Sequence, residues 1–164
     1  MTVKDAILLH SLARECPPLG LHTPYTYWVQ AAFFGGECFI AELDHNPTGF
    51  ITSVTTRDRQ LIWQIGVLPD HRRHGYSQLL IDAVVQSAIA QGREGIEFSI
   101  NPENVASFSA FKAYADRNGL VIHEIGTLHL TDPLNPNFRE FESVYILPLP
   151  ETETAPKASP TEGS

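Results

Sequence analysis

One stretch of the chain joins an apolar segment, a short basic loop and a long amphipathic segment without a break. Residues Leu61–Val67 are mostly apolar and predict a strand. Residues Ser77–Gln91 repeat apolar side chains at helical spacing until Gly92, which predicts a helix. The loop between them contains two arginines and a glycine. A strand that passes through a tight loop into a helix indicates an α/β fold in which the helix packs back on a sheet.

The rest of the chain supplies further strands and helices around this stretch. Helices are predicted over Asp5–Glu15, from the Thr23-Pro24 cap to Gly35, and over Val105–Asn118. Strands are predicted over Glu37–Leu43, Phe50–Thr56, Gly95–Ile100, Leu120–Leu130 and Glu142–Leu149, with a turn at residues 45–49. We expect one domain over residues 1–149. Residues 150–164 are rich in Pro, Thr, Glu and Ser, and we expect a disordered tail there.

The charge and cysteine content exclude several classes of protein. The net charge is −8 in 164 residues, and the only basic concentration is His71-Arg72-Arg73-His74, so nucleic acid is not an expected partner. No apolar run reaches the ~18 residues that span a membrane. The cysteines Cys16 and Cys38 show no disulfide or metal spacing, and the N-terminus shows no signal peptide. We expect a cytoplasmic protein with no metal.

The basic loop has the properties of an anion site. Backbone N–H groups at a helix N-terminus are unpaired and lie at the positive end of the helix dipole, which favours a phosphate. Gly75 allows a close approach of the backbone, and Arg72 and Arg73 supply charge. An ordinary strand-to-helix turn with solvated arginines is the alternative interpretation of these residues taken alone.

In this context, the loop resembles the acyl-CoA loop, R/Q-x-x-G-x-G/A, of the GNAT superfamily of N-acetyltransferases. The resemblance extends over about residues 2–149 and includes the end of the preceding strand, Ile65-Gly66-Val67, and Asn104 at the start of the later helix. It implies a mostly antiparallel mixed sheet of about six to seven strands flanked by about four helices. It also implies acetyl-CoA as co-substrate, bound by Ile65, Gly66, Val67, Arg72, Arg73, His74, Gly75, Tyr76, Ser77, Asn104 and Phe111.

The loop and the later helix depart from the family pattern at two positions. Ser77 stands where Gly or Ala is usual. Phe111 stands where many members carry a tyrosine proposed to protonate the leaving thiolate. Phenylalanine has no proton to give, so the sequence assigns no general acid.

Three segments resemble the diaminobutyrate acetyltransferases of ectoine biosynthesis: residues 19–27, 62–67 and 97–111. Gly20 replaces an aspartate of that branch and His22 an asparagine. The resemblance implies that the acceptor is a small diamine or basic amino acid. The residues expected near the acceptor are His22, Thr23, Tyr25, Tyr27, Trp63, Gln64, Glu140 and Glu142. The two glutamates among them could supply the negative charge that Gly20 lacks. Aromatic and acidic residues at such positions also commonly serve packing or solvation.

We expect the amine to attack the acetyl thioester directly in a ternary complex. An amine with a pKa near ~10 is mostly protonated at neutral pH, so a base must first remove a proton. Glu97, at the glutamate position of the branch, is the candidate base. Backbone N–H groups around Gly66 and Val67 are candidates to polarise the thioester carbonyl. Trp63 and Gln64 should point to opposite faces of their strand unless a bulge intervenes.

Two other functions remain open on the sequence: a protein or peptide N-terminal acetyltransferase, and an acyl-CoA-binding protein without catalysis. A peptide needs an open groove, whereas a diamine needs a closed pocket with carboxylates. Phe111 favours the non-catalytic alternative. A homodimer is compatible with all of these readings.

Overall fold

The structure is a computed structural model that describes residues 1–150. The helices are α1 (Ala6–Arg14), α2 (Pro24–Phe34), α3 (Tyr76–Ala90) and α4 (Val105–Arg117), with short 3-10 turns at Val3–Asp5, Gly35–Glu37 and Pro69–His71. The strands are β1 (Phe39–Leu43), β2 (Asn46–Thr56), β3 (Arg59–Val67), β4 (Gly95–Ile100), β5 (His123–Asp132) and β6 (Asn135–Pro148).

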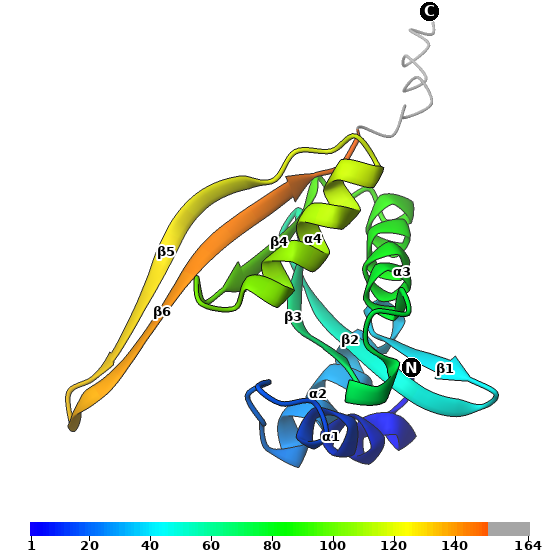
Figure 1. Ribbon diagram of the computed structural model, residues 1–164, viewed down its shortest axis with the longest axis horizontal. Coiled ribbons are helices and arrows are strands. Elements are labelled where there is room, and N and C mark those ends of the chain that lie inside the picture. Colours follow the sequence, from blue (N-terminus) through cyan, green and yellow to red (C-terminus); the bar gives the residue numbers. More distant parts are fainter. Residues whose placement is uncertain (151–164) are drawn as a thin grey trace, which may run out of the picture.

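The strands form one six-stranded sheet in the order β1-β2-β3-β4-β6-β5. Only β3 and β4 run parallel, because α3 carries the chain back between them, and the other neighbours are antiparallel. Figure 1 shows α3 and α4 beside the sheet, α1 and α2 at the far end of β2 and β3, and β5 and β6 extending away together. The predicted mixed, mostly antiparallel sheet with four helices is confirmed.

The helices cover opposite faces of the sheet. Phe50 packs in one buried cluster with residues of α1 and α2, whereas its neighbour Ile51 packs in a second cluster with residues of α3 and α4. Neighbouring side chains on a strand point to opposite faces, so the two helix pairs lie on opposite sides. The second cluster contains Phe111, which is 2% exposed and stacks on Phe98 with ring centroids 3.9 Å apart.

Two predicted boundaries differ most from the structure, by four and seven residues at the starts of β2 and β6. The turn expected at residues 45–49 lies one or two residues earlier, at Asp44 and His45, which both have positive φ, and β2 already begins at Asn46. A tight hairpin turn of this kind needs only two residues, so the Asn-Pro pair belongs to the strand. The last strand begins at Asn135 instead of Glu142, because the N–H of Leu134 donates to Asp132 Oδ1 (2.8 Å) and closes a short turn.

The expected tail begins at Pro150 and, apart from that residue, lies outside the described residues. Within residues 1–150, no helix is both long and apolar enough to cross a membrane.

We predict that Phe111→Ala lowers the free energy of unfolding by about 3–5 kcal/mol, because it leaves a cavity against Phe98. Leu79→Ala on α3 is the matched control: Leu79 is 63% exposed, and its loss should change stability by no more than about 0.5 kcal/mol. Chemical denaturation followed by circular dichroism measures both values. Equal effects of the two substitutions would contradict the placement of Phe111 in the core.

Candidate active site

The parallel pairing of β3 and β4 stops five residues before the end of β3 and two residues before the end of β4. The last paired residues are Ile62 and Phe98, although β3 continues to Val67 and β4 to Ile100. Beyond Ile62, β3 is therefore hydrogen-bonded on its β2 side only. Its other edge presents backbone groups that have no strand partner, and a buried or ligand-facing edge of this kind requires partners from elsewhere.

The alternation of the backbone decides which groups lie on this open edge. The N–H of Leu68 donates to the carbonyl of Thr48, next to β2, at 2.9 Å. Backbone N–H groups alternate along a strand, so the N–H of Gly66 also faces β2, whereas those of Ile65 and Val67 face the open edge. Of the two backbone donors predicted from sequence, only Val67 is therefore oriented toward a ligand between the strands.

Gly66 has a packing role instead. A Cβ at this position would lie 2.8 Å from the ring of Phe50 and 3.2 Å from Cys16 Sγ. Both contacts are tighter than side chains normally tolerate. Glycine is needed here because the ring of Phe50, from β2, and Cys16, in the segment after α1, pack directly against β3.

The loop after β3 presents a run of unpaired backbone donors. Within residues 1–150, the N–H groups from Arg73 to Ser77 make no hydrogen bond, and no side chain caps the N-terminus of α3. Gly75 has φ +87°, and a Cβ built on it would meet nothing within 4 Å. These donors lie at the positive end of a 15-residue helix dipole. The loop therefore fits a phosphate group, as the sequence predicts.

The two arginines of the loop play different parts. Arg72 donates from Nε to the carbonyl of Val67 (3.1 Å) and from a terminal nitrogen to that of Pro17 (2.7 Å). It thereby ties the loop to the end of β3 and to the segment after α1. Arg73 makes no hydrogen bond or ion pair within residues 1–150 and is exposed. Arg73 is thus the arginine that is free to approach a phosphate, whereas Arg72 holds the loop.

A β-bulge places Trp63 and Gln64 on the same side of the sheet. Thr52 pairs with Gln64 and Ser53 with Ile62, so Trp63 is the extra residue of β3. Both side chains contact the segment around α2: Gln64 meets Tyr27, and Trp63 meets His22. A bulge interrupts the alternation of side chains, so Trp63 and Gln64 do not point to opposite faces and both can lie beside a substrate.

Gln64 and Tyr27 form a buried hydrogen-bonded pair. The phenol of Tyr27 donates to Gln64 Oε1 (3.0 Å), and Gln64 Nε2 donates to the carbonyl of Gly20 (2.6 Å). Burial raises the pKa of the Tyr27 phenol, so this group stays protonated and acts as a donor. The pair fixes the loop before α2 against β3. Gly20, where the resembling branch has an aspartate, is held through its backbone.

His22 is held beside this pair by Trp63. The indole Nε1 of Trp63 donates to His22 Nε2 at 3.1 Å. The bond occupies the lone pair of Nε2, so a neutral His22 carries its proton on Nδ1. Trp63 remains 47% exposed. Trp63, His22 and the Tyr27–Gln64 pair therefore form one partly exposed wall at the open end of β3.

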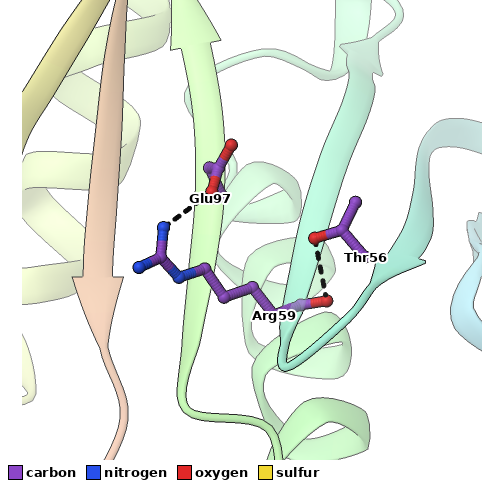
Figure 2. A network of polar contacts seen from close by, with 3 residues as sticks. All are labelled: Thr56, Arg59 and Glu97. Atoms are coloured by element: carbon purple, nitrogen blue, oxygen red, sulfur yellow. Dashed lines mark hydrogen bonds and ion pairs between the residues drawn. The ribbon is translucent and has the colours of Figure 1, made fainter.

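Glu97 lies on β4, one residue before the pairing with β3 ends. Arg59 donates to Glu97 Oε2 at 3.0 Å, and Figure 2 shows this pair with Thr56, whose hydroxyl donates to the carbonyl of Arg59 (3.4 Å). Its neighbours Ile96 and Phe98 are buried in the core beneath α3 and α4, so Glu97 faces the opposite side. Glu97 Oε1 makes no hydrogen bond within residues 1–150, and the side chain is 25% exposed. The sequence did not predict Arg59 as a partner of Glu97, because this pairing depends on the register between β3 and β4.

The two other predicted carboxylates are in different surroundings. Glu142 accepts a hydrogen bond from the hydroxyl of Ser99, which lies on the same face of β4 as Glu97. Glu140 pairs across the hairpin with Leu130, outside the β4 contact, and is exposed. The structure brings Glu142, but not Glu140, next to β4.

The other predicted residues serve mainly to shape the surrounding elements. Thr23 caps α2 by accepting from the N–H of Thr26, and Asn104 caps α4 by accepting from the N–H of Ser107. The side-chain NH2 of Asn104 has no hydrogen-bond partner among residues 1–150. Tyr25 is 70% exposed and stacks on Trp28. Tyr76 packs edge-on against His71, and His74 is exposed on the loop. Phe111 lies in the core and presents no polar atom.

A known protein family matches more than half of the chain. Residues 7–115 match the Acetyltransferase (GNAT) family. The chain belongs to the GNAT family. The match contains the open edge of β3, the loop before α3 and the start of α4, and it ends before the β5–β6 hairpin.

Relatives of this GNAT chain include two named L-2,4-diaminobutyric acid acetyltransferase. The protein of Streptomyces avermitilis is 32% identical over 71% of this chain and 68% of its own length. That of Chromohalobacter salexigens is 30% identical over 71% of this chain and 62% of its own length. The diaminobutyrate acetyltransferase EctA of Paenibacillus lautus, solved with L-2,4-diaminobutyric acid and coenzyme A, has a TM-score of 0.77, 24% identity and 90% coverage of both chains. The predicted family and fold are confirmed.

We predict that Arg73→Ala weakens coenzyme A binding about tenfold while leaving the melting temperature unchanged, because it removes a charge-assisted contact and no internal bond. Arg72→Ala is the matched variant and should also lower stability by about 1 kcal/mol, through loss of its two carbonyl contacts. Isothermal titration calorimetry and thermal unfolding separate the two. Unchanged binding in both variants would show that the loop holds no phosphate.

Proposed function

We propose that this protein transfers the acetyl group of acetyl-CoA to a primary amine of a small diamine or basic amino acid resembling 2,4-diaminobutyrate. The observation that carries the proposal is the run of unpaired N–H groups from Arg73 to Ser77, next to the open edge of β3. The relatives that share most of the chain support the acceptor class, because they are named for diaminobutyrate.

In this proposal, the loop holds the pyrophosphate. The N–H groups of residues 73–77 and the guanidinium of Arg73 bind the phosphate oxygens, and Arg72 keeps the loop in place. The side-chain NH2 of Asn104, which has no partner within the described part of the chain, is available to the rest of the cofactor from the start of α4. Acetyl-CoA supplies an activated acetyl thioester. Ile65 and Val67 would contact the cofactor along the open edge of β3. There the N–H of Val67 donates to the thioester carbonyl oxygen, on which negative charge develops during the attack.

Glu97 removes the proton from the acceptor amine. Oε1 is available for this proton, whereas Oε2 is bound by Arg59, which fixes the orientation of the carboxylate. Because Phe111 presents no polar atom and is buried, proton delivery to the leaving thiolate falls to another group or to solvent.

The wall formed by Trp63, His22 and the Tyr27–Gln64 pair borders the acceptor. The indole face of Trp63 suits an ammonium group through a cation–π contact, and Glu142 supplies a second carboxylate on the face of β4 that carries Glu97. These groups replace the charge that Gly20 does not provide. Both cysteines are free and buried, which supports a reducing, cytoplasmic location.

We predict that Glu97→Gln lowers kcat/KM for the acceptor about 100-fold at neutral pH without changing coenzyme A binding, because it removes the base and preserves the shape. The defect should shrink as the pH rises toward the pKa of the amine, near ~10. Glu42→Gln, at an exposed position on β1, is the control and should retain full activity. An unaltered pH–rate profile in Glu97→Gln would remove Glu97 from the mechanism.

Thiol release across a panel of diamines, basic amino acids and peptides tests the acceptor class. Burial raises the pKa of Cys38 to about 11 and also raises that of Cys16. Both thiols therefore stay protonated near pH 8 and should not react with the thiol reagent used in the assay. Turnover with 2,4-diaminobutyrate or a similar diamine supports the proposal. Turnover with peptides only would replace it with a peptide N-terminal acetyltransferase, and tight coenzyme A binding without turnover would indicate a non-catalytic binding protein.

A further inference from the structure

Arg59 reaches from β3 to Glu97 on β4 and uses only part of its guanidinium to do so (Figure 2). The terminal nitrogen Nη1 donates to Glu97 Oε2 at 3.0 Å. The other terminal nitrogen, Nη2, is turned away from Glu97 and makes no hydrogen bond among residues 1–150. A guanidinium commonly binds a carboxylate through two of its nitrogens, so this ion pair leaves part of the fork unused.

The inner nitrogen of the same group is also unpaired. Arg59 Nε is buried and has no hydrogen-bond partner among the described residues. A guanidinium stays charged at every ordinary pH, so it cannot avoid the cost of missing partners by losing its proton. The side chain as a whole is still 35% exposed, which leaves it open to a ligand. Arg59 is therefore a partly buried cation with room for a second anion.

The described part of the protein supplies no second anion beside Arg59. Gly95, which pairs with Arg59 across β3 and β4, has no side chain. On the same face, β6 places Pro148 opposite Gly95 and Ile146 opposite Glu97. Ile146 lies so close to Gly95 that a Cβ there would be 3.0 Å from Ile146 Cδ1. Within residues 1–150, Glu97 is the only carboxylate that forms an ion pair with Arg59.

Arg59 lies on the face of the sheet that carries the proposed acceptor site. Arg59, Leu61 and Trp63 alternate along β3, so their side chains point to one side. Glu97 lies on that side of β4, because Arg59 contacts it there. None of these four side chains is fully buried. The acceptor site therefore has a cation at its Arg59 end, beside the candidate base.

We infer that Arg59 binds a carboxylate of the acceptor through Nη2, so that the acceptor is a short-chain amino acid with a free carboxylate and not a simple diamine. This inference rests on the proposed acetyl transfer and narrows its acceptor class. The carboxylate of the acceptor takes Nη2 of Arg59. The amine that reacts meets Glu97 Oε1, which has no partner among the described residues.

The geometry of the ion pair limits the length of the acceptor. Nη2 and Oε1 each lie just beyond the 3.0 Å contact that joins Nη1 of Arg59 to Oε2 of Glu97. A ligand that reaches both atoms must carry its carboxylate only a short chain away from the reacting amine. 2,4-Diaminobutyrate meets this condition. The side-chain amine of lysine would have to fold back toward its own carboxylate, at a cost in conformational entropy.

The charges of the site favour the same acceptor. Arg59, Glu97 and Glu142 place one cation and two carboxylates around this face. At neutral pH, 2,4-diaminobutyrate carries two ammonium groups and one carboxylate, so each of its charges has an opposite charge in the site. 1,3-Diaminopropane has the same two amines without the carboxylate and would leave Arg59 unmatched.

A comparison of 2,4-diaminobutyrate with 1,3-diaminopropane tests the inference. In the wild-type protein, kcat/KM should be about 10- to 100-fold higher for 2,4-diaminobutyrate, which is the effect of one hydrogen bond to a charged group. 2,4-Diaminobutyramide, in which a neutral amide replaces the carboxylate, should behave like 1,3-diaminopropane. In Arg59→Gln, the preference for 2,4-diaminobutyrate over both probes should disappear.

The ratio of the acceptors separates carboxylate binding from the support of Glu97. Poorer orientation of Glu97 lowers kcat for every acceptor, whereas loss of the carboxylate contact raises KM for 2,4-diaminobutyrate alone. Dividing the ratio in a variant by that in the wild type cancels differences in amine reactivity. Arg59→Lys keeps the charge and should retain part of the preference. Arg57→Gln, in the exposed turn before β3, removes the same charge outside the site and should leave the ratio unchanged.

Three results would overturn the inference while leaving acetyl transfer intact. They are equal wild-type kcat/KM for the three acceptors, a preference that survives in Arg59→Gln, and an Arg59→Gln defect of the same size for every acceptor. Absence of turnover with any of these amines, with coenzyme A binding retained, would remove the proposed function and the inference together. The wild-type comparison needs no variant, so a misfolded Arg59→Gln protein does not prevent the test.

Discussion

The end of β3–β4 pairing after Ile62 and Phe98 is the constraint on which the site depends. The two strands are held together at Arg59–Ile62 and separate afterwards, so the last residues of β3 keep one unpaired edge. The chain leaves this edge through the short loop that begins α3, which brings the open strand edge and the unpaired helix N-terminus next to each other. A ligand with an anionic end and a carbonyl group satisfies both sets of donors at once.

The N-terminal helices are fixed against β3 by specific contacts. Gly66 allows Phe50 and Cys16 to approach the strand, Gln64 holds the loop at Gly20, and Arg72 holds the carbonyl of Pro17. The same strand therefore carries backbone donors on its open edge and positions the wall at Trp63 and His22 on its face. The bulge at Trp63 makes this possible, because two consecutive side chains reach the same side.

Several of these features could be predicted from residue patterns. The order of helices and strands, the basic loop and the capping role of Thr23 follow from local properties, because periodicity, glycine and cap residues act within a few positions. The two misplaced boundaries lie at tight turns, at Asp44-His45 and beside Asp132. There, proline and asparagine suggested a longer loop than the backbone needs.

The sequence by itself therefore determined the family, the order of the elements and the position of the basic loop between β3 and α3, since each depends on neighbouring residues. Only the tertiary structure decided that Val67 and not Gly66 faces the open edge, that Arg72 supports the loop while Arg73 is free, and that Arg59 orients Glu97. It also separated Glu140, on the exposed β5–β6 hairpin, from Glu142, beside Ser99. These assignments depend on strand register and on which edge remains unpaired, and contacts between segments distant in the chain determine both.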